Sequence, residues 1–153
     1  MDRLELKVPP IIQMVITASL MWILAVLLPT MSIAFFASAL VALVLASIGV
    51  AVAILGVQAF LAADTTIDPR IPNQSSSLVT KGVYSISRNP MYVGFLLMLV
   101  GWGVFLFNIV SFLLLPLFVM YMNRFQITPE ERYMRKKFGQ EYSQYAAAVR
   151  RWV

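Results

Sequence analysis

The chain of 153 residues contains no cysteine and no histidine. It therefore cannot form a disulfide, a thiolate zinc site or a nucleophilic dyad based on Cys or His, and it has no histidine general base. Charge is also scarce, because 12% of the residues are charged, against about 25% in a soluble domain. So few charges cannot cover a surface that faces water, and a soluble globular protein is close to excluded.

Two long stretches, residues 8–63 and 89–123, have no charged residue at all. A membrane-spanning helix needs about 20 apolar residues, so each stretch is too long for one span and predicts two helices joined by a turn. The turns are expected at residues 29–32 and near Asn108. The predicted helices cover residues 10–28, 33–60, 91–107 and 110–123. The last two are short, which predicts a tight hairpin that barely crosses the bilayer.

The predicted fold class is therefore an all-α polytopic membrane protein with about four transmembrane helices. We treat residues 1–153 as one membrane domain, in which a helical hairpin at 8–61 precedes a more polar part at 62–153. All 12 Lys and Arg residues lie outside the predicted helices, and four spans place them on one side. Because positive residues gather on the cytoplasmic side, both termini are expected in the cytoplasm, at a bacterial inner membrane. A cleaved signal peptide is the alternative interpretation of the N-terminus.

The loop at residues 62–90 is dense in Pro, Ser, Thr and Asn and is expected to be irregular and cytoplasmic. Its last residues contain a signal for a helix start. Asn89 precedes Pro90, and this pair is typical of a helix with a capping side chain and a proline in its first turn.

The tail predicts two short helices. Thr128, Pro129 and Glu131 form the pattern of a capping box, and Gly139 is expected to end the helix that follows. A second amphipathic helix is predicted over residues 140–150. Aromatic and apolar residues recur in this part of the tail at helical spacing, which favours a helix lying at the membrane surface. These residues are Tyr142, Tyr145, Val149 and Trp152.

Two polar clusters could carry chemistry. Glu130 and Glu131 could attract a cationic ligand, or they could cap a helix and favour its positive end. Arg88, next to a helix N-terminus, could bind a carboxylate, or it could reach the membrane surface as an ordinary arginine. Arg124 is either a surface anchor or a second cation beside Arg88, and Gly94 allows the close approach of a ligand or of a helix. The pattern predicts a cytoplasm-facing pocket that opens toward lipid.

Several of these residues belong to motifs that resemble the integral-membrane methyltransferase superfamily. This superfamily includes isoprenylcysteine carboxyl methyltransferases and phospholipid N-methyltransferases, and the resemblance covers residues 64–153. Asn89 stands where the isoprenylcysteine branch often has His, which favours the phospholipid branch and a broad bacterial group. The motifs are Gly-Val-Tyr at 82–84, Ser-Arg-Asn-Pro-Met-Tyr-Val-Gly at 87–94, Gly-Trp at 101–102, Pro-Glu-Glu at 129–131 and Lys-Phe-Gly-Gln-Glu-Tyr-Ser-Gln-Tyr at 137–145.

The resemblance implies S-adenosylmethionine as methyl donor, bound by the C-terminal part without a Rossmann domain and without a metal. Arg88, Arg124 and Glu130 are the catalytic candidates, with the arginines orienting the acceptor or the donor carboxylate. The resemblance implies that the donor-binding residues are Tyr84, Arg88, Asn89, Pro90, Tyr92, Gly94, Glu130, Glu131, Tyr142 and Tyr145.

The expected partners are the lipid bilayer and a lipophilic acceptor, and no nucleic acid. The donor's sulfonium is already activated, so such an enzyme needs mainly to align donor and acceptor and to exclude water. The acceptor could be a lipid amine, a carboxylate, a thiol or a phenol, and the oligomeric state is left open. The alternative function is a non-enzymatic membrane carrier or assembly subunit, which would leave the 62–90 loop without a role.

Overall fold

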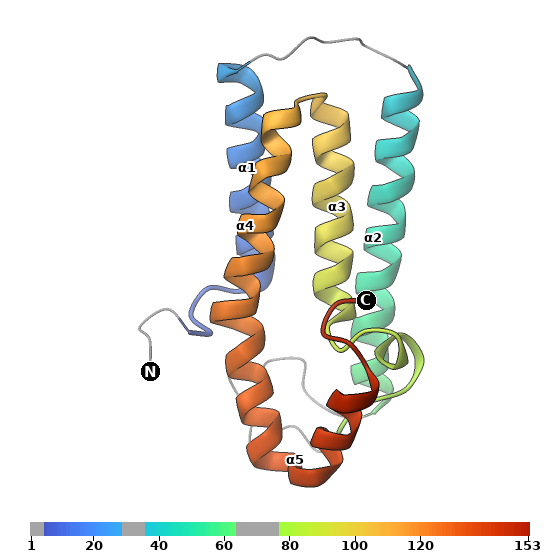
Figure 1. The fold of residues 1–153 in the computed structure, drawn as a ribbon. Coiled ribbons are helices and arrows are strands. Elements are labelled where there is room, and N and C mark those ends of the chain that lie inside the picture. The colour runs from blue at the N-terminus through green and yellow to red at the C-terminus, as the bar shows by residue number, and fades with distance from the viewer. Residues whose placement is uncertain (1–4, 29–35, 64–76) are drawn as a thin grey trace.

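A computed structural model describes residues 5–28, 36–63 and 77–153 (Figure 1). Over these ranges the regular structure is helical and contains no strand, which confirms the predicted all-α class. The predicted turn at 29–32 and residues 64–76 of the 62–90 loop lie outside the described residues. The elements are α1 (Pro10–Leu27), α2 (Phe36–Ala62), the 3-10 turn η2 (Gly82–Ser85), α3 (Pro90–Leu106), the 3-10 turn η3 (Ile109–Leu113), α4 (Leu114–Tyr121), the π-turn η4 (Met122–Ile127) and α5 (Thr128–Ala148).

The four apolar helices alternate in direction, so that the starts of α1 and α3 lie at the same end of the bundle as α5 (Figure 1). Helix α3 is central, because it packs along α2 on one side and contacts α1 and α4 on the other. The buried apolar cluster lies between α1, α3, α4 and η4. Its members are Met21, Tyr92, Leu99, Phe118, Met122 and Ile127.

Glycines allow α2 and α3 to pack with their backbones in contact. A Cβ atom on Gly49 would lie 2.6 Å from the carbonyl oxygen of Gly94, and a Cβ atom on Gly94 would lie 2.5 Å from that of Gly49. Gly101 makes the same kind of approach to the backbone of Ala42. Of the two interpretations of Gly94, the structure therefore favours the helix contact, and the face of Gly94 that could admit a ligand is covered by α2.

The surface of the bundle suits a lipid environment. Large apolar side chains such as Trp22, Leu43 and Ile54 are about half exposed or more. Among the described residues, Pro10–Leu27, Ser38–Ala62 and Ile109–Ala148 are long and apolar enough to cross a membrane. Helix α3 is apolar but shorter, and its 17 residues span about 26 Å against about 30 Å of hydrocarbon.

The helix that contains the fourth apolar segment continues beyond its predicted end. The chain stays helical from α4 through the π-turn into α5, so the predicted break before Thr128 is wrong. The capping box is wrong for the same reason, since an uninterrupted helix has no free N–H groups at that point. The Thr128 hydroxyl instead donates to the Asn123 carbonyl, at 2.7 Å. Charged residues resume at Arg124, and we place the spanning part of this helix before it.

The tail turns back onto the bundle. Gly139 has φ 54° and ψ −118°, a conformation available essentially to glycine, and it bends α5 at the predicted stop. The spacing of the aromatic residues predicted that they face the membrane surface. In the structure, the segment after the bend directs Tyr142 and Tyr145 toward the protein instead. Tyr142 is buried, and the Tyr145 hydroxyl donates to the Tyr84 carbonyl at 2.7 Å. These aromatic residues therefore pack on the protein itself.

Candidate functional site

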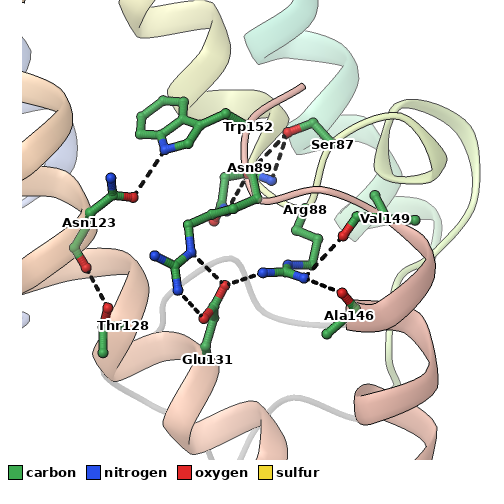
Figure 2. A network of polar contacts seen from close by, with 10 residues as sticks. Ser87, Arg88, Asn89, Asn123, Thr128, Glu131, Ala146, Val149 and Trp152 are labelled. Carbon is green, nitrogen blue, oxygen red and sulfur yellow. Dashed lines mark hydrogen bonds and ion pairs between the residues drawn. The ribbon is translucent and has the colours of Figure 1, made fainter. Parts of the chain in front are cut away.

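The polar residues of the two predicted clusters meet at the end of the bundle where α3 begins. Arg88 precedes α3, Glu131 lies in the first turn of α5, and the chain after α5 returns between them (Figure 2). The Arg88 Nη2 atom donates to Glu131 Oε1 at 2.7 Å. The structure thus brings Arg88 and the acidic pair together, as the sequence predicts.

Glu131 is held by two arginines. Besides the bond from Arg88, its Oε1 accepts from Arg151 Nε at 3.0 Å and its Oε2 accepts from Arg151 Nη2 at 2.7 Å. Burial alone would raise the pKa of the Glu131 carboxyl, but hydrogen bonds from Arg151 and Arg88 outweigh burial, and the pKa lies below its ordinary value. Glu131 is therefore an ionised partner of the protein's own cations.

Sequence reasoning did not assign Arg151 to the site. The signal available was the arginine doublet at 150–151, which stands beside the aromatic residues of the tail. Arginine doublets beside aromatic residues are common at membrane surfaces, and sequence spacing cannot show that the chain reverses direction after α5.

Arg88 also closes the end of α5. Its Nη1 atom donates to the carbonyl oxygens of Ala146 and Val149, at 2.6 and 3.0 Å. The side chain is only 12% exposed, and its Nε atom is buried without a hydrogen-bond partner in the described part of the chain. Both terminal nitrogens of the guanidinium therefore bind other groups of the protein, and the buried Nε–H group is available for a further hydrogen bond.

Asn89 stands just before α3 and Pro90 opens the helix, as the sequence predicts. The Asn89 side chain does not cap the helix, however, and that part of the prediction is wrong. Its Nδ2 atom donates to the Arg151 carbonyl at 2.8 Å, because the returning chain lies within reach of the amide. Asn89 therefore fastens the end of the chain to the start of α3.

Glu130 faces different partners from its neighbour. Its Oε1 atom accepts from the Tyr92 hydroxyl at 2.7 Å and from Gln126 Nε2 at 2.6 Å. Burial raises the pKa of the Glu130 carboxyl to about 7, although the hydrogen bonds from Tyr92 and Gln126 act in the opposite direction. No described cation pairs with this carboxylate. Near neutral pH it is therefore a titrating acid with no cationic partner among the described residues.

Tyr84 carries a second buried polar group, and it is near enough to Glu130 for the carboxylate charge to affect its pKa. The residue is 4% exposed, and within residues 5–28, 36–63 and 77–153 its buried hydroxyl has no hydrogen-bond partner. Burial raises the pKa of the Tyr84 phenol well above its ordinary value, and Tyr145 and Glu130 raise it further. The Tyr145 and Tyr142 rings lie 6.2 Å apart between centroids, and the Tyr145 hydroxyl donates to the Tyr84 carbonyl.

Arg124 lies outside these contacts. Its side chain is 51% exposed, pairs with Glu5 at 3.2 Å and lies over the Phe125 ring. Glu5 also pairs with Arg132 at 3.4 Å. Of the two interpretations of Arg124, the structure favours the surface anchor, and a role for it in orienting an acceptor stays a prediction.

These features define a helical membrane protein whose buried polar site closes one end of the bundle and is built from the predicted methyltransferase motifs. Residues 37–141, more than half of the chain, match the phospholipid methyltransferase family. The chain therefore belongs to this family, which confirms the resemblance found in the sequence. No solved structure matches the chain.

Individual relatives agree with this assignment. An uncharacterised protein from Haemophilus influenzae is 43% identical over 63 residues, which are 41% of this chain and 100% of that protein. The protein-S-isoprenylcysteine O-methyltransferase of Schizosaccharomyces pombe is 40% identical over 77 residues, 50% of this chain and 33% of the enzyme. Protein-S-isoprenylcysteine O-methyltransferase B of Arabidopsis thaliana is 42% identical over 72 residues, 47% of this chain and 36% of the enzyme. The matched part spans about a third of these two enzymes.

Proposed function

We propose that this protein transfers a methyl group from S-adenosylmethionine to a lipophilic or lipid acceptor at the cytoplasmic face of a membrane. The observation that carries the proposal is hydrogen-bonding capacity that the protein does not use. The Tyr84 hydroxyl and the Arg88 Nε atom are both buried and have no hydrogen-bond partner among the residues that the structure describes. Buried polar groups are almost always satisfied, so these two indicate a ligand. Because the chain belongs to a methyltransferase family, this ligand is better explained as a methyl donor than as a molecule transported by a carrier.

The residues present fit this donor. It carries a sulfonium and an ammonium group, and Glu130 offers a carboxylate that no described side chain neutralises. The Tyr84 hydroxyl, which has no described partner, can donate to or accept from the donor's polar groups. The Arg88 Nε atom adds a buried N–H donor that suits a carboxylate.

The two glutamates then have separate roles. Glu131 holds Arg88 and Arg151 and forms part of the framework. Glu130 accepts from Tyr92, acts on the Tyr84 phenol through its charge, and is in this proposal the residue that binds the cationic donor. Pro90, Asn89 and Tyr142 shape the surroundings of these side chains, and their direct contact with the donor stays a proposal.

When bound, S-adenosylmethionine supplies a methyl group that is already activated by its sulfonium leaving group. The work of the chain is to align the reactants and to keep water away from them, which the buried position of Tyr84 and Glu131 favours. A carboxylate or thiolate acceptor needs no base. An amine acceptor must first lose a proton, and the pKa of about 7 makes the Glu130 carboxylate our candidate for the base that takes it.

Calorimetry of donor binding by the whole protein in detergent tests the proposal. We expect wild type to bind S-adenosylmethionine, and Glu130→Gln to bind it at least about tenfold more weakly, because a charge-assisted hydrogen bond contributes about 1.5–3 kcal/mol. Glu141→Gln is the matched control, since Glu141 is an exposed glutamate on the same helix. Absence of binding by wild type, or equal affinity of the two variants, would refute the proposal.

A further inference from the structure

The chain after α5 crosses the start of α3 and ends against the π-turn. We call residues 149–153 the strap. The backbone N–H of Arg88 donates to the Arg150 carbonyl at 3.0 Å, and Asn89 Nδ2 donates to the Arg151 carbonyl at 2.8 Å. Farther along, Trp152 Nε1 donates to Asn123 Oδ1 at 3.0 Å (Figure 2). The strap therefore links the start of α3 to η4 across the polar site.

Within the strap, Arg151 is the residue directed into the site. Its Nε and Nη2 atoms bind the two oxygens of Glu131 separately, at 3.0 and 2.7 Å. This two-pronged geometry fixes both the position and the rotation of a carboxylate, which a lysine ammonium cannot do. The Glu131 side chain is 10% exposed and Arg151 is 36% exposed, so the pair lies at the wall of the site.

This pair is coupled to the residues proposed to face the donor. Glu131 is covalently next to Glu130, so a shift of the first turn of α5 moves both carboxylates. Arg88, held by the same Glu131 oxygen, fixes the end of α5 through Ala146 and Val149. The Tyr145 hydroxyl, on that end of α5, binds the backbone of Tyr84. The family match ends at residue 141, so it assigns nothing to Arg151.

We propose that Arg151 is a positioning residue of the methyl-donor site, whose guanidinium holds Glu131 and Arg88 so that Glu130 and Tyr84 stay directed at the donor. The inference rests on the proposed function. Arg151 does not touch the donor in this account. It acts through Glu131, and it leaves Glu130 as the one member of the acidic pair that is free to bind a cation.

The test compares neighbouring arginines in the whole protein in detergent. Arg151→Gln removes the two-pronged contact, Arg151→Lys keeps the charge but not the geometry, and Arg150→Gln is the matched control because its side chain is exposed. We expect Arg151→Gln to weaken binding of S-adenosylmethionine about tenfold or more, since the groups that bind the donor would no longer be held in position before it binds. Arg151→Lys should recover part of the loss, and Arg150→Gln should bind within about twofold of wild type.

Melting of the donor-free variants separates positioning from folding. The inference is overturned if a folded Arg151→Gln binds the donor as wild type does, or if Arg150→Gln weakens binding equally. If Arg151→Gln does not fold, Arg151→Lys decides the question, and wild-type affinity in that variant contradicts the inference. Failure of wild type itself to bind the donor refutes the proposed function instead.

Discussion

At the scale of single residues, the pKa values of two consecutive glutamates are shifted in opposite directions. Hydrogen bonds from Arg151 and Arg88 lower the pKa of Glu131, whereas burial without a cation raises that of Glu130 to about 7. The sequence could predict that both carboxylates lie near Arg88. It could not predict which of them is paired, because that depends on the strap, which reaches only one of the two.

The raised pKa of Glu130 predicts that donor binding depends on pH. Protons compete with the cationic donor for this carboxylate, so affinity should rise with pH up to about 7 and level off above it. Below that pH it should fall by about tenfold per unit, as expected for one linked proton. Titrations at several pH values measure this, and Glu130→Gln should give a flat profile. A flat wild-type profile would contradict the assignment of Glu130.

The same shift affects the stability of the donor-free protein, with a definite sign. A carboxyl whose folded pKa is raised from 4.5 to about 7 stabilises the fold fully below its unfolded pKa, and this contribution is lost as pH rises through 7. Melting curves across this range should therefore show a loss of stability that Glu130→Gln lacks.

Tyr84→Phe separates a binding role from a structural one. The Tyr84 hydroxyl is buried and unpaired, so its removal should leave the donor-free protein as stable as wild type, or more stable. Donor affinity should nevertheless fall by roughly two- to tenfold, the equivalent of one ordinary hydrogen bond. Melting and calorimetry on the same preparation measure both quantities. A destabilised variant with unchanged affinity would show that the hydroxyl serves the fold.

At the scale of elements, apolar length predicted four helices and their order, because the spans lack charge and the connections hold it. The continuous path from α4 to α5 could not be predicted. A π-turn shifts the hydrogen-bond register without changing the residue types, and Thr128-Pro129-Glu130-Glu131 is also a good helix start. The N–H of Leu6 donates to the Phe125 carbonyl within this turn at 3.0 Å, and this long-range contact also has no local signal.

The close contact between α2 and α3 predicts that adding a single methyl group at Gly94 destabilises the protein strongly. Gly94→Ala would place Cβ 2.5 Å from the Gly49 carbonyl oxygen, and a backbone atom inside a helix cannot move aside easily. We expect a loss of about 1–3 kcal/mol in the free energy of unfolding, typical of overpacking. Reversible unfolding in detergent measures it. Ala51→Val, on the exposed side of α2, is the control, and equal effects of the two changes would contradict the account.

At the scale of the whole molecule, the bundle has one polar end and one apolar end. The start of α1, the start of α3 and α5 share the first, and the α3–η3 connection lies at the second (Figure 1). With all 12 positive residues outside the apolar stretches, we propose that the first end faces the cytoplasm.

Because the chain has no cysteine, single cysteines can report this orientation cleanly. Ile109 is 72% exposed at the apolar end, and Lys136 is exposed on α5. In intact bacterial cells whose outer membrane is permeabilised, Ile109→Cys should react with an impermeant maleimide. Lys136→Cys should react only after the inner membrane is opened. The opposite pattern would place the proposed site on the other face.

The account is tested most directly by incubating membranes that contain the protein with S-adenosylmethionine labelled in its methyl group. We expect the label to enter a product that extracts with lipid, and Glu130→Gln membranes with equal amounts of protein to incorporate at least about tenfold less. Incorporation no greater than in membranes without the protein, or equal incorporation by wild type and Glu130→Gln, would contradict the claim that this polar site transfers methyl groups.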